Sequence, residues 1–112
     1  MSIQEQELGQ SRENSTNAVS VYSPSFNETG IIKNITLCNT TASPITFRLF
    51  KDNDGATYDH STAHFYDYPL DANETKILVT YWPMNNSSGN LAYRSSVANA
   101  LTITVSGAVI TV

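Results

Sequence analysis

The chain has 112 residues, which is the size of a single domain. Charged residues make up only 14% of it, against about 25% in an average soluble protein, and serine, threonine and asparagine together fill 37 positions. This polar but uncharged composition favours strands and turns over helices, whose exposed faces favour Glu, Lys, Arg and Gln. The net charge is −4, so we expect no general electrostatic binding to nucleic acid or to an anionic membrane.

Residues 1–18 differ in composition from the rest of the chain. Ile3 and Leu8 stand there among mostly polar residues with no apolar periodicity. Such a segment cannot offset its own ordering entropy by packing. We therefore predict a flexible, extended N-terminal arm at residues 1–18 and a β domain at residues 19–112. We expect the arm to become ordered on a partner subunit, with Ile3 and Leu8 as its apolar anchors.

From residue 19 onward the apolar residues alternate as they do in strands, and turn residues separate the runs. The expected strands lie at 19–22, 31–38, 45–50, 65–68, 77–82, 91–93, 101–105 and 108–112. Many short strands without helical periodicity predict an all-β fold, an antiparallel β-sandwich or jelly roll of about eight strands. The apolar parity of these strands places Leu37, Phe47, Val79 and Ile103 in the core.

The sequence also bears on where the protein folds. Cys38 is the only cysteine, so no disulfide forms within the chain. The first ten residues lack the basic and then apolar order of a secretory signal, and no apolar run approaches the roughly 20 residues of a membrane span. We expect a protein that folds in a reducing cytoplasm and has no contact with membranes.

Potential metal ligands are concentrated in residues 52–67, which include Asp52, Asp54, His60 and His64. A calcium-binding loop of the EF-hand type, with Gly55 at its sixth position, would need an oxygen ligand where Phe50 stands and a bidentate glutamate where Ser61 stands. The template therefore fails at both ends. The two histidines are four residues apart, about 13 Å on a strand, which is too far for one metal ion. We predict ordinary turns here and no metal.

No pattern in the chain specifies a reaction. There is no Gly-x-Ser-x-Gly motif, the five glycines are too scattered for a phosphate-binding loop, and Cys38 is flanked by strand residues without a basic neighbour. We therefore expect a protein that is not an enzyme and has no cofactor.

Four aromatic residues, Tyr66, Tyr68, Tyr81 and Trp82, are candidate exposed contacts. Aromatic faces of this kind can stack on sugar rings. The alternative is that they fill the core or a subunit contact, where Tyr and Trp are also enriched.

Several stretches of the chain resemble small β-sandwich virion proteins of tailed bacteriophages. After an extended lead-in, that group has a strand and a second hairpin strand similar to residues 30–41 (GIIKNITLCNTT) and 45–50 (ITFRLF). Its turn before a later strand is similar to residues 70–75 (LDANET), and its closing strand pair around a Ser-Gly step is similar to residues 99–111 (NALTITVSGAVIT). Together these stretches cover most of residues 22–112.

The resemblance implies a non-enzymatic structural protein of the virion. Our first expectation is a capsid decoration (cement) protein, a trimer on the capsid surface that binds the major capsid protein after folding in the host cytoplasm. One alternative is a tail, neck or fibre-associated virion protein with the same sandwich, and another is a carbohydrate-binding module. The resemblance says nothing about residues 52–69, because the group usually has a shorter middle section with fewer His, Tyr and Asp residues.

Overall fold

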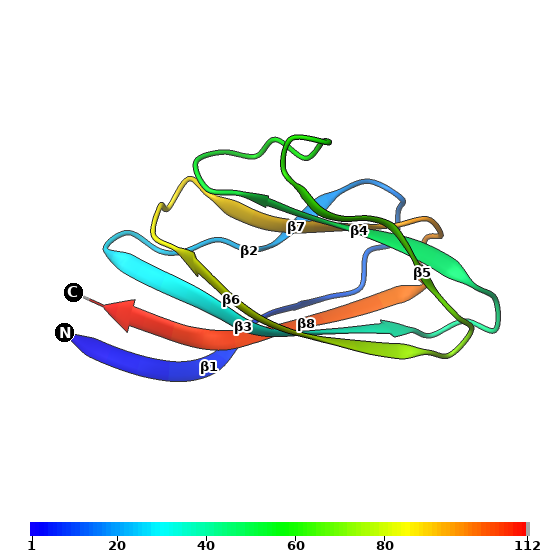
Figure 1. The fold of residues 1–112 in the computed structure, drawn as a ribbon, viewed down its shortest axis with the longest axis horizontal. Coiled ribbons are helices and arrows are strands. Elements are labelled where there is room, and N and C mark those ends of the chain that lie inside the picture. Colours follow the sequence, from blue (N-terminus) through cyan, green and yellow to red (C-terminus); the bar gives the residue numbers. More distant parts are fainter. Residues whose placement is uncertain (112) are drawn as a thin grey trace.

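The computed structural model describes residues 1–111, and its regular structure consists of strands (Figure 1). The strands are β1 (Ser2–Ser11), β2 (Val19–Tyr22), β3 (Glu28–Asn39), β4 (Ile45–Asp52), β5 (Ala63–Leu70), β6 (Thr75–Met84), β7 (Asn90–Ser95) and β8 (Leu101–Thr111). Residue 112, the end of the last expected strand, lies outside the described residues. Within residues 1–111 no helix is long and apolar enough to cross a membrane.

The strands form two four-stranded sheets, in the orders β1-β8-β3-β6 and β2-β7-β4-β5, and all neighbours are antiparallel. The first strand pairs with the last, the second with the seventh, the third with the sixth and the fourth with the fifth, as in one long hairpin that has been rolled up. Two packed sheets with this pairing make a jelly roll. The predicted all-β sandwich or jelly roll of about eight strands is confirmed.

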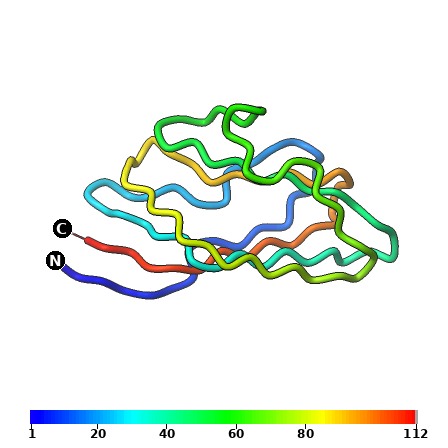
Figure 2. Tube along the Cα trace, viewed as in Figure 1, coloured from blue at the N-terminus to red at the C-terminus, as the bar shows by residue number. Residues whose placement is uncertain are grey.

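The N-terminal segment differs from the sequence prediction. Residues 2–11, expected in a flexible arm outside the fold, form β1, which runs along β8 from Ser2 opposite Thr111 to Ser11 opposite Ile103. Figure 2 shows the start of β1 and the end of β8 side by side at one end of the sandwich. An edge strand can be held by backbone hydrogen bonds without apolar side chains, so apolar periodicity does not reveal it. The predicted arm is therefore wrong for residues 2–11.

Side-chain contacts hold the second half of β1, and a backbone hydrogen bond holds the connection that follows it. Leu8 lies at a bulge in the β1–β8 register and packs against the core. The hydroxyl of Ser11 lies 2.6 Å from the hydroxyl of Tyr93, whose side chain is fully buried. In the connection, the carbonyl oxygen of Glu13 accepts a hydrogen bond from the backbone N–H of Asn99 at 3.0 Å. This part of the chain therefore belongs to the β domain.

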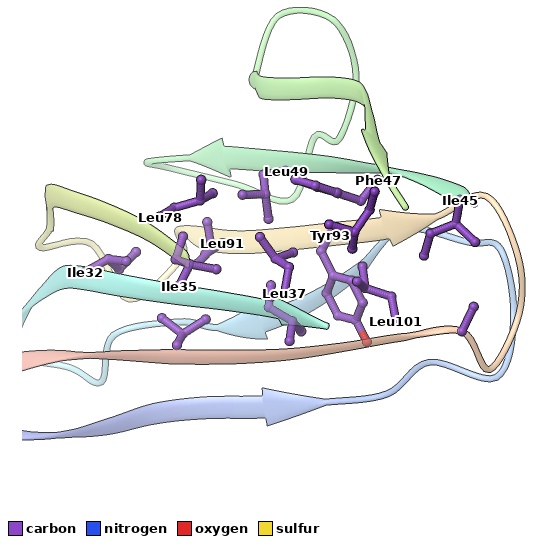
Figure 3. Close-up of a cluster of buried hydrophobic side chains, with 14 of the residues drawn as sticks. Ile32, Ile35, Leu37, Ile45, Phe47, Leu49, Leu78, Leu91, Tyr93 and Leu101 are labelled. Atoms are coloured by element: carbon purple, nitrogen blue, oxygen red, sulfur yellow. The ribbon is translucent and has the colours of Figure 1, made fainter. Parts of the chain in front are cut away.

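The hydrophobic core fills the space between the two sheets (Figure 3). Most of the buried side chains alternate along their strands, as the period of two requires. In β3 the inward parity changes between Ile32 and Ile35, because a bulge interrupts the register at Lys33. Leu37, Phe47 and Ile103, which the sequence places in the core, are each fully buried. The other buried members of this cluster are Ile32, Ile35, Ile45, Leu49, Leu70, Leu78, Met84, Leu91, Tyr93, Ala100, Leu101 and Val105.

The predicted burial of Val79 is wrong. Its side chain is 84% exposed, whereas the neighbouring Leu78 is buried and Trp82 packs against the core. Both parities of this strand are largely apolar, with Ile77, Val79 and Tyr81 on one side and Leu78, Thr80 and Trp82 on the other. The alternation alone therefore could not decide which side of β6 faces the core.

Truncation of Phe47 tests the core assignment. Phe47→Ala should lower the free energy of unfolding by about 3–5 kcal/mol, because it leaves a cavity among fully buried neighbours. Val97→Ala, at an exposed position of the loop before β8, should change it by no more than about 0.5 kcal/mol. Denaturant unfolding followed by circular dichroism measures both. A loss below about 1 kcal/mol for Phe47→Ala would contradict the assignment.

Deletion of residues 2–11 tests whether β1 is part of the β domain. The deletion removes the ladder along β8 and the packing of Leu8, so we expect the melting temperature to fall by at least about 5 °C, equivalent to roughly 1 kcal/mol or more. Removing only residues 2–5, whose side chains are all exposed, should have a smaller effect. If the variant without residues 2–11 melted at the same temperature as the full chain, the result would support a detachable arm instead.

Candidate functional site

The outer face of the β1-β8-β3-β6 sheet has a central area without charged side chains, which we call the uncharged face. Strand pairing places its outward residues side by side, because Thr36 lies opposite both Thr104 and Ile77, and Asn34 lies opposite both Ser106 and Val79. The uncharged face consists of Asn34, Thr36 and Cys38 on β3, Ile77, Val79 and Tyr81 on β6, and Thr102, Thr104 and Ser106 on β8.

Three of these side chains form an apolar row on the edge strand β6. Ile77 is 59% exposed, Val79 is 84% exposed and Tyr81 is 67% exposed. They occupy alternate positions, so the row extends about 13 Å along the strand. A row of exposed apolar side chains on an edge strand gains free energy when another surface covers it. The row is therefore the candidate binding surface of the described residues.

Charged side chains lie beside this face rather than on it. Lys33 Nζ lies 2.7 Å from a carboxylate oxygen of Glu5 on β1, which lowers the pKa of Glu5 through the hydrogen bond and the opposite charge. Depletion of charge in the centre, with charges at the margin, is typical of the buried part of protein–protein interfaces.

The four aromatic residues selected from the sequence are not brought together. Tyr66 and Tyr81 are exposed, but Tyr66 contacts Arg48 on the outer face of the second sheet, whereas Tyr81 belongs to the uncharged face of the first. Tyr68 and Trp82 are half-buried and both pack against the core. Two aromatic side chains on opposite outer faces cannot stack on the same sugar ring.

The two predicted anchors of the N-terminal arm also have different environments. Leu8 packs against the core of its own domain, whereas Ile3 is 64% exposed on β1 opposite Ile110. Leu8 is therefore an internal contact, and Ile3 remains an exposed apolar side chain at the edge of the sheet.

The outer face of the second sheet carries an ion pair that the sequence did not indicate. The guanidinium of Arg48 donates from Nε to one carboxylate oxygen of Asp67 at 2.7 Å and from Nη2 to the other at 3.1 Å. The same guanidinium lies 3.9 Å from the ring centre of Tyr66, and the ring centre of His60 lies 4.7 Å from that of Tyr66. Asp67 has a φ of 52° at a bulge opposite Arg48, which turns its carboxylate towards the guanidinium.

Residues 53–62 cover another part of this outer face. Phe50 points outward from β4 but is buried, with its ring centre 6.1 Å from that of Tyr58. The carboxylate of Asp52 fixes the start of this loop by accepting backbone N–H groups of Asp54 at 3.2 Å and Thr57 at 2.9 Å, and these hydrogen bonds lower its pKa. Residues 53–62 therefore shield the outward side chain of Phe50 from solvent.

The potential metal ligands of residues 52–67 point to separate partners. The ring of His60 lies against Tyr66, and the ring of His64 lies 4.8 Å from that of Trp82. Asp52 is engaged with backbone N–H groups. Within residues 1–111, no group of three or more His, Cys, Asp or Glu side chains is placed to hold a metal ion.

One open hollow lies at the end of the sandwich near the chain termini. It has a volume of about 540 Å³ and is lined by residues 26–29 and 85–87. Phe26 at its margin is exposed. Glu28 is the only titratable residue among those that line the hollow, so the lining contains no cluster of groups that could catalyse a reaction.

Comparisons with known proteins give little information on identity. No family model and no curated protein matches the chain. A chain from "Structure of infectious bursal disease virus Gx strain" is similar to it with 10% sequence identity and a TM-score of 0.48, and the match covers 95% of this chain and 29% of that one. The chain therefore spans less than a third of the length of that neighbour. At this TM-score the likeness establishes neither a shared fold nor a shared function.

The Arg48–Asp67 pair predicts a specific pH dependence of stability. The hydrogen bond from Arg48 is the main cause of a lowered pKa of Asp67, whose ordinary value is 3.8. A carboxyl group with a lowered folded-state pKa stabilises the fold above its unfolded-state pKa, and this contribution is lost as the pH falls through the folded-state value. Asp67→Asn should therefore melt below the wild type at pH 7. The difference in melting temperature should shrink as the pH falls below 3.8 and disappear below the lowered folded-state pKa.

The comparison of variants isolates this pair. Asparagine tolerates the positive φ at position 67, so Asp67→Asn removes the charge and keeps the backbone conformation. Arg48→Lys keeps the positive charge but loses the two-point contact, so it should melt below the wild type as well. Thermal melts between pH 2.5 and pH 7 measure both. If the melting temperatures of the wild type and Asp67→Asn differed by the same amount at every pH, the result would contradict the proposed link between the ionisation of Asp67 and stability.

Proposed function

We propose that this protein is a non-enzymatic structural component of a bacteriophage virion, and specifically a capsid decoration (cement) protein. In this proposal a trimer binds the outside of the major capsid protein shell and stabilises it. The uncharged face with its exposed row of Ile77, Val79 and Tyr81 is the observation that carries the proposal. A surface of this kind is suited to binding another protein surface, and binding is the entire task of a cement protein.

Two further features support a virion setting. The stretches that resemble phage virion proteins form β3, β4, the turn before β6, and β8, which build most of the sandwich. The jelly roll occurs in viral capsid proteins, although lectins and cupins also use it, so the fold alone does not select the function.

The carbohydrate-binding alternative has less support from the arrangement of the aromatic residues. A sugar platform needs an accessible aromatic face beside polar groups. The ring of Tyr66 already has Arg48 and His60 as neighbours, and Tyr81 lies on the opposite outer face. No pair among the four candidate aromatics is exposed on the same face.

The test uses purified particles with and without the protein. Particles that contain it should carry the protein in numbers on the order of hundreds, one set for each repeated capsid site, because a shell lattice repeats its binding site by symmetry. Shells that lack the protein should disrupt at a lower temperature, and adding the purified full chain should restore the temperature of the complete shell.

Each alternative has its own outcome in this test. A few or tens of copies per particle, with no effect on shell stability, would contradict the cement proposal and indicate a tail, neck or fibre component. Failure to bind particles, together with binding to a glycan array that is lost in Tyr66→Ala or in Tyr81→Ala, would contradict the virion role and indicate a carbohydrate-binding module.

A further inference from the structure

We propose that the hollow lined by residues 26–29 and 85–87 binds a neutral saccharide. In this proposal the ring of Phe26 covers one face of the sugar, and Glu28 with the neighbouring amide and hydroxyl groups binds the sugar hydroxyls. The inference goes beyond the proposed structural role. The hollow shares no residue with the uncharged face or with the four aromatic residues selected from the sequence.

Internal hydrogen bonds hold both walls of the hollow in place. Figure 1 shows the β2–β3 and β6–β7 connections, which form these walls, at the same end of the sandwich. In the first connection the backbone N–H of Glu28 donates to the carbonyl oxygen of Ser25 at 3.1 Å. The hydroxyl of Ser23 joins the two connections, because it lies 2.5 Å from the carbonyl oxygen of Gly89 and 3.2 Å from that of Ser87. The walls are therefore preformed, which lowers the cost of binding a ligand.

Phe26 is an aromatic side chain that the fold leaves on the surface. It stands in the tight turn between Ser25 and Glu28, where Asn27 has the positive φ of 62° that such a turn needs. The ring of Phe26 is 80% exposed and has no polar group of its own. An exposed apolar ring gains free energy when another apolar surface covers it, and the C–H face of a pyranose ring is such a surface.

The polar side chains of the lining match the hydroxyl groups around the edge of a sugar ring. Amides and hydroxyls both donate and accept hydrogen bonds, and a carboxylate accepts them from two directions. Within residues 1–111, no protein group forms a hydrogen bond with the side chains of Asn27, Glu28, Thr29, Asn85 or Ser87. These groups are therefore available to a ligand.

Elsewhere the chain uses its loop amides internally. The side-chain amide of Asn39 donates to the carbonyl oxygens of Ser43 at 2.9 Å and Asp71 at 3.0 Å. The side-chain amide of Asn90 donates to the carbonyl oxygen of Gly55 at 2.9 Å. The unused amides and hydroxyls at the hollow thus differ from those that fix the other loops.

The charge of the lining favours neutral sugars. Glu28 is the only charged residue in it, and the chain has a net charge of −4, so an acidic sugar would meet a like charge. The hydroxyl of a neutral sugar can donate to the carboxylate in a charge-assisted hydrogen bond. A cationic amine would also suit Glu28, but it would leave the acceptor-seeking amides of the lining unused. A single carboxylate indicates binding without hydrolysis, because glycosidases use a pair.

A buried hydroxyl beside this wall lacks a hydrogen-bond partner. The hydroxyl of Tyr22 is buried and has no partner among the described residues. It lies over Gly30, which directly follows the lining segment, so that an added Cβ there would collide with it. Burial and the negative charge of Glu28 raise the pKa of Tyr22, so its hydroxyl stays protonated and can donate. A ligand beside Glu28 would bring an acceptor to it, directly or through an ordered water molecule.

The experiment titrates the isotope-labelled full chain with single sugars and follows the backbone amide signals by NMR. The probes are glucose, galactose, mannose and N-acetylglucosamine, each at up to about 100 mM, which is a hundred times a millimolar dissociation constant. We expect at least one of them to shift the signals of residues 26–29 and 85–87 until they saturate. A dissociation constant on the order of millimolar is expected for a small ligand at an open site.

Two variants and two matched controls locate the site. Phe26→Ala should raise the dissociation constant by at least about 10-fold, because it removes the stacking face. Glu28→Gln keeps the size of the side chain but removes its charge, and it should raise the constant by about 3- to 10-fold. Tyr81→Ala and Glu7→Gln remove an exposed aromatic ring and an exposed carboxylate at other places and should leave it unchanged. The amide spectra show that each variant is folded.

Two charged probes separate a neutral saccharide from other ligands. Glucuronic acid should bind at least about 10-fold more weakly than the best neutral sugar, because its carboxylate meets Glu28. Lysine tests for a site that takes a cation. The inference would be overturned by the absence of saturating shifts with all four neutral sugars, by an unchanged dissociation constant in Phe26→Ala, or by shifts with lysine alone.

The outcomes also separate this inference from the proposed function. A chain that stabilises shells but binds none of the sugars contradicts the saccharide site and leaves the cement role in place. A chain that binds a sugar in the hollow but does not bind shells supports the site and contradicts the cement role.

Discussion

The pairing of β8 with β1 on one side and β3 on the other is the interaction on which the rest of the structure depends. This double ladder joins β1, near the start of the chain, to β8 near its end, and it fixes the register of three of the four strands of the first sheet. Because side chains alternate, the same register places Leu101, Ile103 and Val105 in the core and Thr104 and Ser106 on the opposite face. The core and the uncharged face are therefore two consequences of one set of backbone hydrogen bonds.

Sequence reasoning was accurate where only one parity of a strand is apolar. In residues 101–105 of β8 the inward residues are aliphatic and the outward residues are threonine, so the pattern predicted both the strand and the side that faces the core. It gave the wrong face for β6, since Val79 and Leu78 are both aliphatic, and it missed β1, whose side chains are mostly polar. Neither case is decided by local sequence, because the answer depends on which strands lie alongside.

The candidate site depends on topology even more strongly. The uncharged face combines residues from β3, β6 and β8, which are up to about 70 positions apart, so only the sheet order brings them together. The Arg48–Asp67 pair forms because a bulge in β5 turns Asp67 towards β4. The sequence did contain a signal for the uncharged face, although it contained none for the Arg48–Asp67 pair. The scarcity of charged residues and the abundance of threonine indicated an extended uncharged surface, without indicating where it lies.

Two features of the edge strand β6 oppose continuous growth of the sheet from this edge. A long apolar edge strand invites further strands to pair with its free backbone groups. In β6 an extra residue opposite Lys33 makes a bulge, and Pro83 has no backbone N–H to donate. Both features oppose pairing along the edge and leave the outward side chains as the means of contact. The short polar side chain of Thr36 lies directly beside Ile77 of the apolar row, and Thr104 follows it on β8, so the row is flanked by hydrated groups on the side towards the sheet.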